Sequence, residues 1–106
     1  MTNIQMIGAS DFDKEELETI TEMAKHYEEK ITHVVGTIEG KMHLKKHSKG
    51  GKSTKYDLRL TVKVAKKTFD TQESDWELNK TVHKVFKNIQ NQITHKLHTD
   101  DSNPKS

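Results

Sequence analysis

The chain has 106 residues, about the length of one ordinary domain and too short for two. Lysine and arginine number 18 against 16 acidic residues, so the formal net charge is only +2. The absence of cysteine excludes disulfide scaffolds, thiol catalysis and cysteine-ligated zinc. Because no apolar run approaches a membrane span and the first residues do not resemble a secretory signal, we expect a soluble cytoplasmic protein without a membrane partner.

The low hydrophobic content, 30% of residues, raises intrinsic disorder as an alternative to a folded domain. Disordered chains usually carry a large net charge as well, which this chain lacks. The apolar residues are also periodic along the chain, with the spacings of strands and helices. We therefore expect the chain to fold.

The first expected elements are a short strand and a helix. Alternating apolar residues predict the strand over residues 3–8. Asp13 and Glu16 fit a capping box at the start of a helix over residues 13–31, with Ser10 and Asp13 as a competing register. The apolar stripe of this helix consists of Leu17, Ile20, Ala24, Tyr27 and Ile31.

Three strands are expected next. Apolar and polar residues alternate over 33–45 and again over 54–64, a pattern typical of half-buried antiparallel strands. Residues 45–53 are expected to form a flexible turn centred on Gly50 and Gly51, which joins the two strands into a hairpin. A last short strand over 67–71 follows a tight turn near Ala65.

A second helix is predicted over residues 74–98. Ser74 and Glu77 fit another capping box at its start. Its apolar stripe consists of Leu78, Val82, Val85, Phe86, Ile89, Ile93 and Leu97. The polar residues 99–106 are expected to form a disordered tail.

These elements predict one α+β domain over residues 1–98. The order β-α-β-β-β-α favours a two-layer sandwich, in which a four-stranded mixed or antiparallel sheet carries both helices on one face. One apolar sheet face and two amphipathic helices need only a single layer of core, which suits the low hydrophobic content. The expected core is Leu17, Ile20, Ala24, Tyr27, Ile38, Met42, Leu58, Leu60, Val62, Phe69, Val82, Phe86, Ile89 and Ile93.

The small net charge conceals a strong asymmetry. Residues 41–67 hold nine lysines and Arg59 against one acid, Asp57, which is a local charge of +9. Residues 11–30 hold eight acids against three lysines. Lysines on exposed strands can simply deter aggregation, but so large a local excess favours a surface that contacts phosphates.

No motif indicates an enzyme, a cofactor or a metal site. Residues 51–53 resemble the end of a phosphate-binding loop, but Lys46 stands where that motif requires glycine. His95 and His98 have the spacing of one helical face, but they lie near the C-terminal end with Asp100 and Asp101 as the only acids nearby, and we expect them to face solvent. Because the chain has only six aromatic residues, we do not expect base stacking to dominate any nucleic-acid binding.

The order and spacing of the elements resemble those of the ribosome hibernation-promoting factor family, the ribosome-associated inhibitor proteins. The similarity covers residues 4–97 and is carried by residues 56–62, by Phe69 with residues 73–76, and by the lysines of the second helix. The chain resembles the short form of the family in particular, because it ends soon after the second helix.

The resemblance implies a protein that docks on the small ribosomal subunit and touches its RNA. On that basis we expect a monomeric, non-enzymatic protein that modulates translation or protects idle ribosomes, with no small-molecule substrate. The positions that match the family's RNA contacts are Lys80, Lys84, Lys87, Lys25 and Lys30. The basic hairpin adds Lys45, Lys46, Lys49, Lys52 and Arg59, and either group can supply the main contacts.

Two other interpretations stay open. Residues 13–98 are similar to the α-β-β-β-α core of the double-stranded-RNA-binding fold, which reads A-form shape. Alternatively, the acidic first helix docks a basic protein and the chain is an interaction module.

Overall fold

A computed structural model of the protein describes residues 3–49 and 53–101. It shows an α+β fold of two helices and a four-stranded mixed sheet, as the sequence predicts. The elements in chain order are β1 (Ile4–Ile7), the short 3-10 helix η1 (Ala9–Asp11), α1 (Lys14–Val35), β2 (Glu39–Lys49), β3 (Ser53–Val64), β4 (Lys67–Asp75) and α2 (Leu78–Asp101). None of the helices in the described part of the chain is long and apolar enough to cross a membrane.

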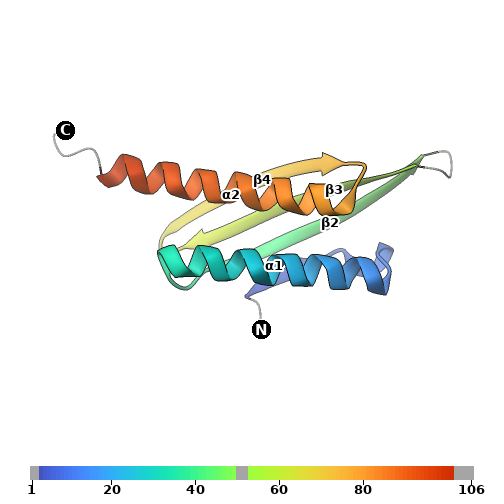
Figure 1. The fold of residues 1–106 in the computed structure, drawn as a ribbon, viewed down its shortest axis with the longest axis horizontal. Coiled ribbons are helices and arrows are strands. Elements are labelled where there is room, and N and C mark those ends of the chain that lie inside the picture. Colours follow the sequence, from blue (N-terminus) through green and yellow to red (C-terminus); the bar gives the residue numbers. More distant parts are fainter. Residues whose placement is uncertain (1–2, 50–52, 102–106) are drawn as a thin grey trace.

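The strands lie in the order β1-β2-β3-β4. β1 runs parallel to β2, with Ile4 opposite Gly40, whereas β2, β3 and β4 are successively antiparallel. The β2–β3 hairpin extends beyond the first turns of both helices (Figure 1). Figure 1 also shows α1 and α2 side by side in front of the sheet.

The core lies between the helices and the sheet side chains that point toward them. Of the predicted core residues, only Leu17 and Phe69 are partly exposed, and all the others are buried. The Tyr27 and Phe86 rings stack across the two helices, with centroids 4.9 Å apart and an interplanar angle of 1°. Further buried residues are Ile4, Phe12, Ile31, Leu44 and Val85.

α1 begins at the predicted capping box. The Asp13 side chain accepts a 2.8 Å hydrogen bond from the Glu16 amide, and the Glu16 side chain accepts one of 3.0 Å from the Asp13 amide. The strand predicted over residues 33–45 is wrong at both ends, since α1 continues to Val35 and β2 spans Glu39–Lys49. The first part of the turn predicted over residues 45–53 is therefore strand. Gly36 then ends the helix at φ 85°, a left-handed backbone that glycine adopts without strain.

The β4–α2 boundary also differs from the prediction. β4 continues to Asp75, and α2 starts at Leu78 instead of 74 and runs to Asp101. Ser74 therefore lies in a strand, and the predicted Ser74–Glu77 capping box is wrong; the Asp75 carboxylate accepts from the Glu77 amide at 3.2 Å. Residues 102–106 of the predicted tail lie outside the described residues.

Candidate nucleic-acid interface

The side chains of β2 and β3 that alternate with the core residues form a second, polar surface, which we call the open sheet face. Its cations are Lys41 and Lys45 of β2 and Lys55, Arg59 and Lys63 of β3. His43 lies opposite Arg59 in the register, and Lys45 lies opposite Asp57. The strand alternation alone thus gathers cations that are distant in sequence.

Two shallow hollows mark this face. One, of about 390 Å³, is lined among others by His43, Lys45 and Arg59. The other, of about 460 Å³, lies farther along the strands beside Lys41 and Lys63. Each hollow is lined by cationic side chains together with one carboxylate, Asp57 in the first and Glu39 in the second.

Part of the charge on the open sheet face is already neutralised. The Arg59 guanidinium forms a two-point contact with Asp70 of β4, at 3.2 and 2.8 Å, and Thr61 donates a further 2.9 Å hydrogen bond to Asp70. The hydrogen bond from Arg59 lowers the pKa of Asp70 and raises that of Arg59. The guanidinium of Arg59, a predicted RNA contact, is therefore already paired with a carboxylate on the sheet surface.

Three lysines of this face remain available for a ligand. Lys41, Lys45 and Lys63 are exposed and make no ion pair within residues 3–49 and 53–101. The Asp57 carboxylate opposite Lys45 accepts instead from the Gln72 amide nitrogen at 2.9 Å. Lys41 and Lys63 were not singled out as contacts from the sequence, although they share the strand alternation of Lys45.

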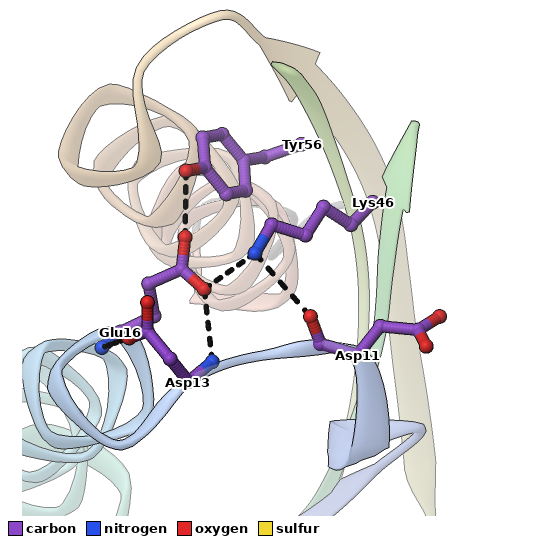
Figure 2. Close-up of polar contacts among 5 residues, drawn as sticks. All are labelled: Asp11, Asp13, Glu16, Lys46 and Tyr56. Carbon is purple, nitrogen blue, oxygen red and sulfur yellow. Dashed lines mark hydrogen bonds and ion pairs between the residues drawn. The ribbon is translucent and has the colours of Figure 1, made fainter. Parts of the chain in front are cut away.

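Lys46 is the exception within the predicted basic hairpin. Strand alternation turns it toward the helices, where its ammonium lies 2.7 Å from a Glu16 carboxylate oxygen and donates to the Asp11 carbonyl at 3.3 Å (Figure 2). It also lies 5.2 Å from the centre of the Phe12 ring. With its side chain only 20% exposed, Lys46 joins β2 to the start of α1 and presents little charge to solvent.

Of the three lysines of α2 predicted as RNA contacts, all are exposed and two form ion pairs. The Lys84 ammonium lies 2.8 Å from the Asp75 carboxylate, and Lys80 lies 3.5 Å from Glu77. The Lys84 hydrogen bond lowers the pKa of Asp75 and raises that of Lys84. Lys87 is exposed, with no ion pair in the described part of the chain. These side chains extend from a helix and not from the open sheet face.

The other predicted contacts lie apart from both groups. Lys25 and Lys30 are exposed on α1, and the Lys30 ammonium lies 5.7 Å from the centre of the Tyr27 ring. The backbone of Lys49 lies opposite Ser53 in the β2–β3 register, at the end of the hairpin, and the Lys49 side chain is not among those that the structure describes. Lys52 falls outside the described residues.

Some of the acidic side chains of α1 form hydrogen bonds or ion pairs with other parts of the chain and do not face solvent freely. Glu28 is buried, and both of its carboxylate oxygens accept from the backbone N–H of Asn3, at 3.1 and 3.0 Å. Glu16 binds Lys46 and Tyr56. The acids of α1 that face solvent are Glu15, Glu18, Glu22 and Glu29.

Neither the known protein families nor the curated proteins contain a match to this chain. Among residues 3–49 and 53–101, no three histidine, aspartate or glutamate side chains are grouped so as to hold a metal ion. The functional argument therefore rests on the chemistry of the surfaces described above.

Proposed function

We propose that this protein binds RNA of the small ribosomal subunit, as a non-enzymatic factor that modulates translation or protects idle ribosomes. The observation that carries the proposal is a set of exposed lysines on the open sheet face that form no ion pair with any residue that the structure describes, Lys41, Lys45 and Lys63. An ammonium without a carboxylate partner displaces counterions from a phosphate backbone at no cost in broken ion pairs.

The two-layer arrangement that we propose explains why neither helix covers the open sheet face. With both helices on one side of the sheet, the other side has no apolar surface to bury and can specialise in polar contacts. The observed element order is the one expected for the ribosome hibernation-promoting factor family, and this likeness directs the choice of RNA toward the ribosome.

The open sheet face is a better primary contact than α2. Binding of phosphate to Lys84 would compete with the 2.8 Å ion pair to Asp75, and Lys80 also has a carboxylate neighbour, Glu77. Lys87 is the member of that group best placed to assist. We therefore assign the main contacts to the sheet and secondary contacts to α2.

The test compares three sets of charge-removing substitutions. The sheet variant carries Lys41→Gln, Lys45→Gln and Lys63→Gln. The α2 variant carries Lys80→Gln and Lys87→Gln, which spare the Lys84–Asp75 pair, and a control carries Lys25→Gln and Lys30→Gln on α1. Each is cosedimented with small ribosomal subunits over a range of salt concentrations, after circular dichroism has verified folding.

We expect the sheet variant to lose most of its binding and each lost phosphate contact to reduce the salt slope by about one unit. The α2 variant should weaken binding less, and the α1 control should bind like the parent. If the sheet variant binds subunits as well as the parent does, the open sheet face is not the binding site. If neither the parent nor any variant sediments with subunits, the RNA proposal is wrong. Nuclease-insensitive capture of one basic protein through α1 would then favour the interaction module.

A further inference from the structure

Trp76, the single tryptophan of the chain, lies in the short link between β4 and α2 and is 54% exposed. Other aromatic rings of the chain, Phe86 and Tyr27, are buried in the core, whereas Trp76 is not. Leaving an indole in water forgoes one of the largest hydrophobic contributions that a side chain can make. Its exposure leaves a large apolar ring surface accessible to a ligand.

The link that carries Trp76 is held at both ends. The Asp75 carboxylate accepts from the Glu77 amide at 3.2 Å and pairs with the Lys84 ammonium at 2.8 Å. Trp76 is therefore a surface aromatic on a constrained backbone. Such a ring loses little conformational entropy when a ligand stacks on it.

A cation of the hairpin lies against this ring. The Lys55 ammonium sits over the indole, 5.9 Å from the centre of the ring. Lys55 stands opposite His47 in the β2–β3 register, and Lys45 follows two residues along β2 on the same face. The exposed ring of Trp76 thus adjoins a row of cationic side chains.

We infer that Trp76 stacks on an unpaired base of a single-stranded RNA segment whose phosphates lie along Lys55 and Lys45. The inference rests on the proposed RNA-binding function and specifies the kind of RNA that the open sheet face takes. A flat base with an adjoining phosphate matches an indole with an adjoining ammonium, and stacking on aromatic side chains is independent of sequence. The bases of a duplex are already stacked on one another and present no face to Trp76.

The test uses Trp76 as its own reporter. The intact chain is titrated with a single-stranded oligouridylate, and with an RNA duplex of equal length, while tryptophan emission and the anisotropy of end-labelled RNA are followed. We expect the single strand to quench the emission and to bind more tightly than the duplex.

Substitutions separate stacking from charge. Trp76→Ala should weaken single-strand binding roughly tenfold or more without changing its salt slope, whereas Trp76→Phe should retain most of the affinity. Lys55→Gln should instead reduce the salt slope by about one unit. Because Trp76 is exposed, both aromatic substitutions should leave the circular dichroism spectrum and the urea midpoint of the parent unchanged.

The two proposals fail in different ways. If the parent binds small subunits, but the single strand leaves Trp76 emission unchanged and Trp76→Ala binds it like the parent, the stacking inference is overturned and the RNA-binding proposal stands. If the parent binds neither subunits nor any RNA, the proposed function is wrong and the inference falls with it. Loss of a nuclease-resistant protein complex in Trp76→Ala, with RNA binding unchanged, would also overturn the stacking inference.

Discussion

The Tyr56 hydroxyl of β3 donates a 2.7 Å hydrogen bond to the Glu16 carboxylate in the first turn of α1 (Figure 2). Burial by itself would raise the pKa of Glu16, but the hydrogen bonds from Lys46, Tyr56 and the Asp13 amide, together with the charge of Lys46, outweigh it and lower that pKa. The same hydrogen bond, together with burial, raises the pKa of Tyr56 to about 12. One carboxylate thus ties the base of the hairpin to the start of the helix.

The Tyr56–Glu16 hydrogen bond predicts a loss of stability in alkali. Because the pKa of Tyr56 is raised on folding, from 10.0 to about 12, its contribution is fully present below pH 10 and is lost as the pH rises toward 12. Tyr56→Phe should cost about 1–2 kcal/mol in the free energy of unfolding at neutral pH. Urea unfolding at neutral and alkaline pH measures both effects, and the variant should lose less stability in alkali than the parent. An unchanged alkaline loss in Tyr56→Phe would contradict this assignment.

Two adjacent lysines predict opposite phenotypes. Lys46→Ala removes the ion pair to Glu16 and the contact with Phe12, and should cost about 1–2 kcal/mol of stability. Lys45→Ala, on the open sheet face, should change stability by less than about 0.5 kcal/mol but lower the salt slope of RNA binding. Urea melts and anisotropy titrations of both variants test this pair. A larger stability loss for Lys45→Ala than for Lys46→Ala would be inconsistent with the observed side-chain directions.

Core substitutions should show how narrow the margin of stability is. Phe86→Ala or Leu60→Ala, both at fully buried positions, should each cost about 2–5 kcal/mol. A domain of this size usually has only about 5–15 kcal/mol in total, so either change approaches unfolding. Val34→Ala, at a position 69% exposed, is the matched control and should be close to neutral. Equal urea midpoints for Phe86→Ala and Val34→Ala would contradict the packing.

The turn between β3 and β4 offers a stabilising change. Ala65 has φ 55°, a left-handed backbone that costs an L-residue about 1–2 kcal/mol relative to glycine. Ala65→Gly should therefore raise the free energy of unfolding by about 0.5–1 kcal/mol, after the larger entropy of the unfolded glycine is subtracted. Thermal and urea unfolding measure the gain. Lys66→Gly is the control, since no positive φ favours glycine there, and it should be neutral or destabilising.

The elements with apolar periodicity were predictable from the sequence because their burial repeats with the period of the backbone. The stripes of both helices, the alternation of β3 and the Asp13–Glu16 capping box all appear in the structure. The predicted end of α1 was wrong because the residues from 33 onward also fit a strand alternation, although Val35 continues the helical stripe and packs against the core. The predicted start of α2 was wrong for lack of an apolar signal. The inward positions of β4 at its end are polar: Glu73 accepts from Asn88, and Asp75 pairs with Lys84. A strand whose inward side chains are satisfied by hydrogen bonds has no hydrophobic alternation to detect.

The charge excess of residues 41–67 was likewise visible in the sequence, but only the tertiary structure decided which cations face solvent. Lys45 and Lys46 are neighbours in the chain, yet strand alternation and a carboxylate 30 residues away make one a surface charge and the other an internal bridge. Ion pairs and exposure depend on contacts between distant segments, which local composition does not encode. The sequence by itself determined how much positive charge the hairpin carries, and the fold determined that Lys41, Lys45 and Lys63 present it to solvent because their neighbours in the strands fill the core.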